Sequence, residues 1–522
     1  MKRLFGVHAL PRAKAAVLMR RARSCYGRFG LAVPITALVL GLAGQLGAQT
    51  FKTVYTFTAT APYPNSTNSD GAGPNSLVLS GNTLYGTAGG GGSGPRGTVF
   101  SLNTDGSGFT TLYSFTAIDT STGSPYFNSD GIDPTGVILS GTTLYGTAGF
   151  AGPSGFGTVF TLNTDGSGFT TLHNFSGSVG DGSLPSAGVI LSGGTLYGTT
   201  YGGGCCGSDL GVVFAVNTDG TGFTDLYTFT TDHEMKSELT LSGNTLYGTT
   251  TGGGIYLNGG GSGFGTVFNV NTDGTGFTPL HQFTPVTAPH YTNSDGVQPA
   301  GVILSGNTLY GTALYGGNSG NGTIFKVNTD GTGFMSLYRF TSSNTNSSGV
   351  WTNSDGAYPQ TVVIVSGNTL YGTCDSGGPW GNGTIFAVNT DGTGFRTLYG
   401  FSATSSNSFR VYTNSDGSSP HGLILSGNTL YGVTGNGGSG GSGTIFSISL
   451  PVAPPQLTII PAGGNVILTW PTNATGFTLQ STTNFGSSAI WMTNSPAQVV
   501  INGQNTVTNP ISGTQQFYRL TQ

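Results

Sequence analysis

Three short patterns each recur seven times along this chain, and the order in which they start constrains the fold more than any other feature. Leu-Tyr-Gly begins at Leu84, Leu144, Leu196, Leu246, Leu309, Leu370 and Leu430. Gly-(Thr/Val)-(Val/Ile)-Phe ends at Phe100, Phe160, Phe214, Phe268, Phe325, Phe386 and Phe446. Phe-x-x-(Leu/Val)-(Tyr/His)-x-Phe starts at Phe51, Phe109, Phe169, Phe223, Phe277, Phe334 and Phe395. The first copy of this aromatic pattern precedes the other two patterns, and no copy follows Phe446. An open stack of repeats has no reason to be permuted in this way, whereas a ring that borrows one strand from its other end requires it.

One repeat reads as four short strands. The unit that starts at Gly136 contains four β-branched or aromatic runs, at 136–139, 143–147, 157–162 and 169–175. Ser-Gly-Thr, a glycine-rich loop and Asn-Thr-Asp-Gly separate these runs and supply the positive φ angles that tight hairpins need. The pattern therefore predicts a four-stranded antiparallel meander in each unit.

The length of the repeat selects the architecture. Successive tyrosines of Leu-Tyr-Gly are 60, 52, 50, 63, 61 and 60 residues apart. This spacing is too long for a leucine-rich or β-helical coil and suits propeller blades with long loops. The 92 glycines and the 7% of charged residues also favour short strands and turns over helices. We therefore predict an all-β fold: a seven-bladed β-propeller over 49–450, closed by an N-terminal strand at 51–57.

The segments outside the repeat have their own signatures. Residues 1–48 combine eight Lys/Arg, no acid and an apolar run, which predicts a signal peptide and hence a secreted or cell-surface protein. Residues 451–455 are a proline-rich linker. The alternating runs of 456–522 predict a small β-sandwich of the fibronectin type III or immunoglobulin type.

Charge excludes two classes of partner. Without residues 1–48 the chain keeps 8 of its 16 Lys+Arg and all 20 Asp+Glu, so the net charge becomes 8 − 20 = −12. A basic surface for nucleic acid or for an anionic membrane is therefore not expected. We also expect no membrane-spanning segment in the mature chain.

The wording of the repeat resembles a known family. Leu-Ser-Gly-Asn-Thr-Leu-Tyr-Gly-Thr, followed by Gly-Thr-(Val/Ile)-Phe and Asn-Thr-Asp-Gly, resembles the GloVer tandem repeat of Gloeobacter and Verrucomicrobia over residues 51–450. Proteins with this repeat are called choice-of-anchor proteins, because their C-terminal modules differ. The tail, with Leu-Thr-Trp-Pro at 468–471 and Phe-Tyr-Arg-Leu at 517–520, resembles fibronectin type III-like endings. The resemblance implies export, and it implies no particular activity or site residue.

Loop length indicates which face binds a partner. The loops between the second and third strands of each unit, and the connections between units, are long and varied, and a meander places both at the same edge. Six of the connections carry Asp-Gly shortly before a proline: Asp70, Asp130, Asp181, Asp295, Asp355 and Asp416. These acids are either a ring of carboxylates for Ca²⁺ or sugar hydroxyls, or turn residues that start each first strand. The lack of the alternating acids found in Ca²⁺ loops favours turns.

Two further groups are candidates on this face. Tyr201, Tyr256 and Tyr315 lie in loops and could stack on a glycan. Cys205, Cys206, Asp209, His233 and Glu234 could bind a zinc or copper ion, or could reflect decay of the repeat or a vicinal disulfide. No motif predicts catalytic residues, and apart from possible Ca²⁺ no cofactor is expected.

Three functions stay open at this point. The first is a binding or scaffolding propeller at the cell envelope or outside it, whose partner is an extracellular glycan or another envelope protein. The second is a glycosidase or lyase with acids on the loop-bearing face. The third is a purely structural envelope protein.

Overall fold

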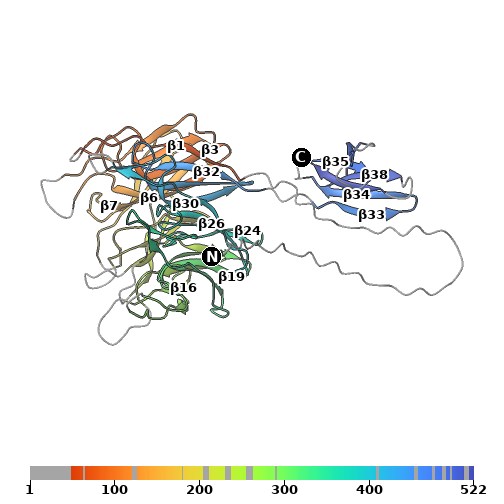
Figure 1. Cartoon of the computed structure of the whole chain (residues 1–522). Coiled ribbons are helices and arrows are strands. Elements are labelled where there is room, and N and C mark those ends of the chain that lie inside the picture. Colours follow the sequence, from red (N-terminus) through yellow and green to blue (C-terminus); the bar gives the residue numbers. More distant parts are fainter. Residues whose placement is uncertain are drawn as a thin grey trace, which may run out of the picture. The chain divides into compact units, whose positions relative to one another are not determined.

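The computed structural model describes residues 49–521, apart from 63–64, 120–125, 179, 204–210, 230–234, 236, 254–262, 289–290, 407–410, 452–455, 473–476, 485–488, 494–496, 502 and 511–515. The predicted signal peptide and most of the predicted linker lie outside the described residues. The chain divides into a unit that spans Gly47–Val452 and a second unit that includes Ala453–Gln522 (Figure 1). Every regular element in the described residues is a strand, which confirms the all-β prediction.

The Gly47–Val452 unit contains seven four-stranded antiparallel sheets among its described residues, which we number in chain order. Sheets 1 to 6 are meanders of consecutive strands. Sheet 1 contains β2 (Ala72–Ser80), β3 (Thr83–Gly90), β4 (Thr98–Asn103) and β5 (Thr110–Ser114), and sheet 2 contains β6 (Ile132–Ser140), β7 (Thr143–Phe150), β8 (Thr158–Asn163) and β9 (Thr170–Asn174). Sheet 3 contains β10 (Ile190–Ser192), β11 (Thr195–Thr200), β12 (Val212–Asn217) and β13 (Thr224–Thr228), and sheet 4 contains β14 (Thr240–Ser242), β15 (Thr245–Thr250), β16 (Thr266–Asn271) and β17 (Thr278–Gln282). Sheet 5 contains β18 (Val297–Ser305), β19 (Thr308–Tyr315), β20 (Thr323–Asn328) and β21 (Met335–Arg339), and sheet 6 contains β24 (Ile364–Ser366), β25 (Thr369–Cys374), β26 (Thr384–Asn389) and β27 (Arg396–Gly400).

Sheet 7 takes its fourth strand from the other end of the repeat region. Its order is β30 (Ser418–Ser426), β31 (Thr429–Asn436), β32 (Thr444–Ser449) and then β1 (Phe51–Thr56). The strands β1 and β32 are antiparallel, with Phe51 opposite Ile448 and Thr56 opposite Thr444. The segment that follows the predicted cleavage site therefore lies beside the strand that ends the last repeat.

Two of the sequence patterns interlock inside each sheet. The leucine of Leu-Tyr-Gly is fully buried, as at Leu84, and so is the phenylalanine that ends Gly-Thr-Val-Phe, as at Phe100. A Cβ on Gly86 would lie 2.5 Å from Cζ of Phe100 and 2.5 Å from the carbonyl oxygen of Ser76. The glycine of Leu-Tyr-Gly is thus required because the phenylalanine of the neighbouring strand lies directly over it.

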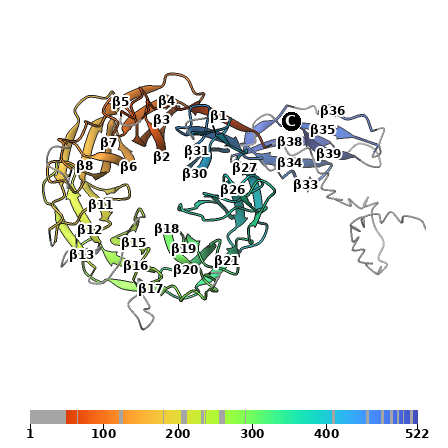
Figure 2. The same cartoon turned by 60° about the vertical axis from the view of Figure 1, so that its left-hand side comes forward.

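The third pattern joins one sheet to the next. The Tyr or His of each outer strand stacks on the first Phe of the following outer strand, with ring centroids 3.5–4.2 Å apart. The seven stacked pairs are Tyr55–Phe109, Tyr113–Phe169, His173–Phe223, Tyr227–Phe277, His281–Phe334, Tyr338–Phe395 and Tyr399–Phe51. Hydrophobic clusters also lie between successive sheets, including one that contains Val433 and Ile445 of sheet 7 together with Leu77 and Leu84 of sheet 1. Figure 2 shows the sheets of this unit following one another around a common centre.

The second unit is built from two antiparallel sheets. One contains β33 (Thr458–Ala462), β34 (Asn465–Pro471), β38 (Gln504–Pro510) and β37 (Val499–Ile501), and the other contains β36 (Met492–Thr493), β35 (Thr478–Thr482) and β39 (Phe517–Thr521). Leu468 and Trp470 of the first sheet and Leu479 of the second belong to one buried cluster. The two sheets therefore enclose a small common core. None of the described residues of the chain belongs to a helix that could cross a bilayer.

Candidate functional site

The six predicted acids occupy the connections between sheets, and five of them are buried. Asp70, Asp130, Asp295, Asp355 and Asp416 are only 1–4% exposed. At Asp130 one carboxylate oxygen accepts hydrogen bonds from the Tyr113 hydroxyl (2.8 Å) and the Thr116 amide (2.9 Å), and the other oxygen accepts from the Thr116 hydroxyl. Asp70, Asp355 and Asp416 repeat this arrangement. Each of these carboxylates holds the first strand of one sheet against the outer strand of the sheet before it.

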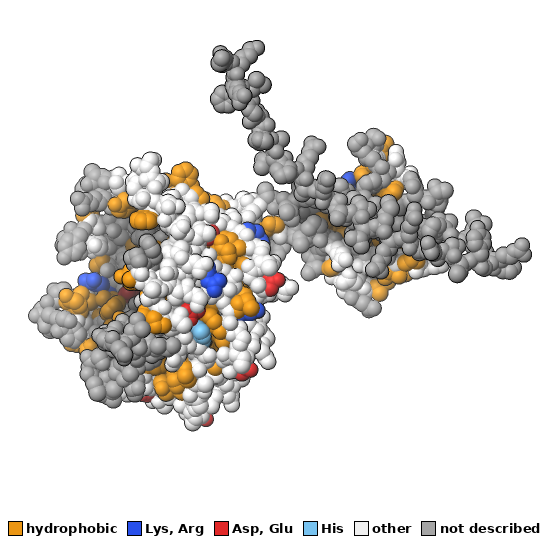
Figure 3. Space-filling view, turned by 60° about the horizontal axis from the view of Figure 1, so that its bottom comes forward, with side chains coloured by type: hydrophobic (Ala, Val, Ile, Leu, Met, Phe, Trp, Pro, Cys, Tyr) orange, Lys and Arg blue, Asp and Glu red, His pale blue; other side chains and the backbone are white. Residues whose placement is uncertain are grey.

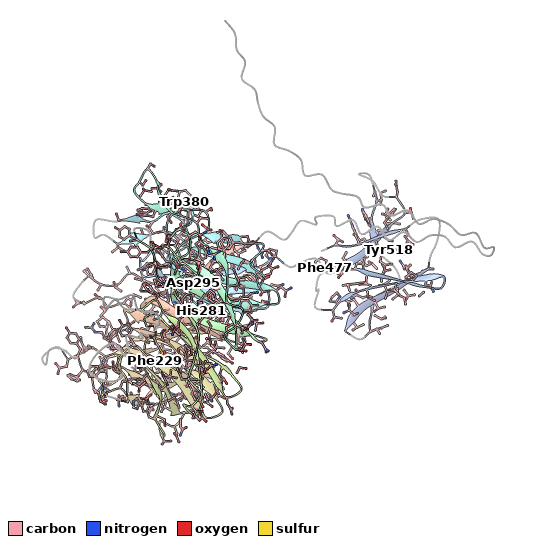
Figure 4. All side chains as sticks on the ribbon, turned by 90° about the horizontal axis from the view of Figure 1, so that it is seen from below. Phe229, His281, Asp295, Trp380, Phe477 and Tyr518 are labelled. Carbon is pink, nitrogen blue, oxygen red and sulfur yellow. The ribbon has the colours of Figure 1, made fainter. Side chains whose placement is uncertain are left out.

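We call these hydrogen-bonded carboxylates anchors. In two of them the side chain on the preceding outer strand is a histidine in place of the tyrosine. Nε2 of His173 lies 2.6 Å from Asp181, and Nε2 of His281 lies 3.3 Å from Asp295. Burial alone would raise the pKa of Asp295, but hydrogen bonds from His281 and Thr284 hold it below its usual range. The pKa of Asp181 is lowered in the same way, by His173 and Ser176 against the effect of burial. The sequence analysis did not anticipate either bond to an anchor carboxylate. Figure 4 labels His281 and Asp295, which lie close together.

The asparagine of Asn-Ser-Asp-Gly fixes the loop of its own sheet. Oδ1 of Asn128 accepts hydrogen bonds from the amides of Gly131 and Gly152 (both 2.8 Å), and its Nδ2 donates to the carbonyl oxygens of Gly131 and Thr116. The equivalent asparagines at 68, 293, 353 and 414 have the same Oδ1 partners. The motif therefore joins a connection to the neighbouring glycine-rich loop.

The other predicted site residues are placed less uniformly. Tyr201 is half-buried, and its amide donates to the carbonyl oxygen of Leu184 (3.0 Å). Tyr315 is 39% exposed and packs edge-on against Tyr358, with ring centroids 5.2 Å apart. The remaining candidates, Tyr256 and the proposed metal ligands Cys205, Cys206, Asp209, His233 and Glu234, lie outside the described residues. Within the part of the chain that the structure describes, no three His, Cys, Asp or Glu side chains form a group that could hold a metal ion.

Sequence reasoning missed a set of exposed aromatic residues. Each lies two positions before an anchoring asparagine: Tyr126 (48% exposed), Tyr291 (66%), Trp351 (64%) and Tyr412 (60%). The first connection has Ser66 at this position. In two connections the aromatic residue is part of a short hairpin, formed by β22 (Asn344–Thr345) with β23 (Trp351–Thr352) and by β28 (Ser405–Ser406) with β29 (Tyr412–Thr413). The signal that could have found this set is the recurrence of an aromatic at a fixed distance before Asn-Ser-Asp-Gly.

One of these residues lines a pocket of about 600 Å³. The pocket lies between the hairpin that enters sheet 7, the glycine-rich loop of that sheet and the loop of sheet 6. Beside Tyr412, its polar lining consists of hydroxyls and amides: Thr60, Asn382, Thr404, Ser418, Asn436 and Ser442. No charged residue is among the described residues that line it. Figure 3 shows a molecular surface of the same general character, with hydrophobic patches separated by uncharged regions and few charged side chains.

A second set of varied residues lies at the start of the first strand of a sheet or in the segment that leads into it. Asp133, Leu184, Gln298, Tyr358 and Ser419 all have φ between 56° and 61°. Each amide donates to a carbonyl oxygen in a loop of the preceding sheet, and Gly73 makes the equivalent bond to Ser442 of sheet 7. A left-handed conformation in a residue other than glycine costs about 1–3 kcal/mol, and such residues concentrate at functional sites.

Two acids, Asp133 on β6 and Glu238 just before β14, have no hydrogen bond to their carboxylates among the described residues. Burial raises the pKa of Asp133 to about 6. Glu238 is exposed to solvent, and desolvation by the surrounding protein raises its pKa as well. A Cβ on Gly188, in the preceding sheet, would lie 2.7 Å from Oε1 of Glu238. Asp133 is therefore a carboxyl that can exchange a proton near neutral pH.

A smaller pocket of about 210 Å³ lies between sheets 6 and 7, lined by Gln360, Thr361, Asp375, Pro420 and His421. Both ring nitrogens of His421 lie 2.9 Å from backbone carbonyl oxygens, those of Ser419 and Pro74. Burial lowers the pKa of His421, while the two carbonyls favour its charged form. The second of these contacts reaches from sheet 7 to sheet 1, so His421 links the two sheets.

The solved structures that the chain matches are only distantly similar to it. The chain matches puromycin hydrolase with 13% identity over 80% of this chain and 63% of that one (TM-score 0.46). It matches the β-propeller domain of the Trilobed protease from Pyrococcus furiosus with 6% identity over 72% and 95% of the two chains (TM-score 0.41). A chain of the nidogen/laminin complex matches with 16% identity over 51% and 79% (TM-score 0.32). None of the curated proteins compared with the chain matches it.

The sequence itself matches one family model over most of its length. The model of the Gloeobacter/Verrucomicrobia repeat matches residues 126–288, 254–406 and 290–460. The matched segments span the repeats whose Asn-Ser-Asp-Gly anchors, glycine-rich loops and aromatic stacks are described above. The chain belongs to the Gloeobacter/Verrucomicrobia repeat family.

Proposed function

We propose that this chain is an exported binding protein for uncharged extracellular polysaccharide, with its site on the loop-bearing face of a seven-bladed propeller. The proposal that the seven sheets form a closed propeller is supported by the pairing of β1 with β32. It is also supported by the seven stacked aromatic pairs, which lead from sheet to sheet and return to Phe51. Export is supported by the composition of residues 1–48. The fibronectin type III-like assignment of the C-terminal unit is supported by its two small antiparallel sheets around Trp470.

The observation that carries the binding proposal is the pocket beside Tyr412. Its volume of about 600 Å³ falls within the usual range for small-ligand sites. A sugar ring offers an apolar face that can stack on an aromatic ring, and its hydroxyls pair with amides and hydroxyls such as Asn436 and Ser442. The pocket has no charged side chain among its described lining residues, so an uncharged ligand matches it best.

The predicted acids do not carry this proposal. Their carboxylate oxygens accept hydrogen bonds from Tyr, Thr, Ser or His side chains of the outer strands. Binding of Ca²⁺ or a sugar hydroxyl by Asp130 would have to displace three such bonds. We therefore assign the Asp-Gly acids to the scaffold, and the exposed aromatic residues to the ligand.

The test is affinity electrophoresis of the full chain in gels that contain mixed-linkage β-glucan, xylan, mannan or starch. We expect one of these polymers to retard the wild-type protein. Tyr412→Ala should weaken this binding at least tenfold, about 1.4 kcal/mol. Phe150→Ala is the matched control, because Phe150 is 47% exposed at the end of β7 in sheet 2 and does not line the pocket. Wild-type protein that migrates alike in all four gels would leave a structural envelope role as the better account.

A carbohydrate-active enzyme is the second candidate, favoured by Asp133. A carboxyl with a pKa of about 6 stays partly protonated near neutral pH and can serve as a general acid. Release of new reducing ends from the polymer that binds would support this function. Asp133→Asn should then abolish the release while the retardation in gels persists.

A further inference from the structure

The surroundings of Tyr412 recur one sheet earlier around Trp351. Both residues belong to the second strand of a hairpin whose strands are two residues long. Trp351 lies opposite Thr345, and Tyr412 lies opposite Ser406. Both are exposed by 60% or more of their surface. Each of the two connections therefore exposes one aromatic ring to solvent from the same position of an equivalent hairpin.

Each hairpin is seated on a glycine of the loop in its own sheet. A Cβ on Gly381 would collide with Cγ1 of Val350, and a Cβ on Gly441 would collide with Cγ1 of Val411. The residue that follows each of these valines is the exposed aromatic, Trp351 or Tyr412. The close contact between hairpin and loop holds the backbone of the aromatic residue in place. Both aromatic rings therefore project from backbone that packs against the rest of the sheet.

The polar groups of the pocket are repeated as well. Asn382 lines the pocket beside Tyr412 and donates from Nδ2 to the carbonyl oxygen of Ser402 (2.5 Å). In the preceding sheet Asn321 donates in the same way to the carbonyl oxygen of Thr341 (2.5 Å), and also to the hydroxyl of Ser343 (3.0 Å). An amide and a hydroxyl therefore occupy matching places in both connections.

Sheets 6 and 7 are neighbours, joined by the cluster that contains Tyr371 of sheet 6 and Leu430 of sheet 7. Resting on the proposed function, we propose that Trp351 and Tyr412 are two subsites of one binding strip, which takes a single linear, uncharged polysaccharide across both sheets. The loop of sheet 6 links the two places, since Gly381 lies against the Trp351 hairpin and the next residue, Asn382, lines the pocket beside Tyr412. A linear polymer of repeating sugars is the ligand class that matches a strip of repeating subsites, because each subsite meets the same chemical group.

A chain-length experiment tests the strip. Disaccharide and hexasaccharide fragments are prepared from whichever polymer retards the wild-type protein, and their affinities are measured by isothermal titration calorimetry. Tyr412→Ala should weaken both fragments at least tenfold. Trp351→Ala should weaken the hexasaccharide about fivefold or more and leave the disaccharide within twofold, because only the longer fragment reaches the second subsite.

Two controls separate the outcomes. Tyr126→Ala removes the equivalent aromatic next to sheet 2, which is not adjacent to sheet 6 or 7, and should change neither affinity. Trp351→Tyr should retain most of the hexasaccharide affinity, because it keeps an aromatic face. Equal hexasaccharide affinity in wild type and Trp351→Ala would overturn the strip while leaving the Tyr412 site intact. Absence of any polysaccharide binding by the wild type would overturn the proposed function itself.

Discussion

Trp351 and Asp355 are four residues apart in the same connection and show what that connection does. Asp355 is 3% exposed, and its carboxylate accepts hydrogen bonds from the Tyr338 hydroxyl (2.8 Å) and the Thr341 amide (2.9 Å). Trp351 is 64% exposed. One short segment thus contains both an internal anchor and a presented aromatic ring. The comparison teaches that repetition in sequence marks the anchor, whereas the residue that meets solvent varies among Tyr, Trp and Ser.

The same division runs through the other connections. Asp295 is 4% exposed and Tyr291 is 66% exposed, and Asp416 and Tyr412 differ in the same way. An acid that is surrounded by donors can be replaced only at a cost in stability, because its partners would be left unsatisfied. A solvent-exposed ring can change with little effect on folding.

Removing an anchor should have the largest effect. Asp355→Ala leaves the Tyr338 hydroxyl and the amide and hydroxyl of Thr341 without their acceptor. We expect a loss of about 3 kcal/mol in the free energy of unfolding, measured by urea denaturation. Asp391→Ala is the control, because Asp391 is fully exposed in a hairpin and accepts only from Thr393. Similar losses in the two variants would contradict the assignment of Asp355 to the scaffold.

Replacing Asp133 should raise stability. Burial raises the pKa of Asp133 to about 6, above its ordinary value, so the folded state favours the protonated form. The ionised group therefore destabilises the fold increasingly as the pH rises through 6. Asp133→Asn should gain roughly 1–3 kcal/mol at pH 8 and nothing below about pH 4. Calorimetric unfolding at both pH values measures this, and an unchanged stability at pH 8 would rule out an uncompensated carboxylate.

The histidine anchors should respond to acid. The pKa of Asp295 is lowered in the folded state, so its contribution to stability is present above about pH 4 and is lost as the pH falls further. His281→Phe keeps a ring to stack on Phe334 but removes the donor to Asp295. It should cost about 1 kcal/mol at pH 5 and less at pH 3. His281→Tyr introduces the residue that the other anchors have and should restore the stability at pH 5. A loss of stability in His281→Phe that is the same at pH 3 and pH 5 would argue against a stabilising bond between His281 and Asp295.

Changing a presented ring should have the smallest effect on folding. Tyr291→Ala is expected to alter the free energy of unfolding by less than about 0.5 kcal/mol, because the side chain is mostly in solvent. Asp295→Ala, four residues away, supplies the contrast within the same connection. Thermal unfolding of both variants makes the comparison, and a marked loss in Tyr291→Ala would assign this ring to the scaffold as well.

Local patterns predicted more of the fold than of the site. The four strands predicted at 136–175 correspond to β6 to β9, since alternation and turn residues are local signals, although β6 begins four residues earlier and β7 ends three residues later than predicted. The count of patterns also indicated the partner of Phe51–Thr56. The sequence favoured turn residues for the six acids but did not predict their hydrogen bonds to the threonines, although Thr58, Thr116 and Thr341 each follow the last Phe of an aromatic pattern and could have signalled them.

The sequence by itself determined the strands, their turns and the seven repeats, because these depend on residues close together in the chain. Only the tertiary structure decided which side chains of each connection face inward and which face solvent. Asp130 and Tyr126 are both polar or amphipathic residues in one connection, yet they are 1% and 48% exposed, and only Asp130 accepts hydrogen bonds from Tyr113 and Thr116. Contacts between neighbouring sheets satisfy one side chain and leave the other free to meet a ligand.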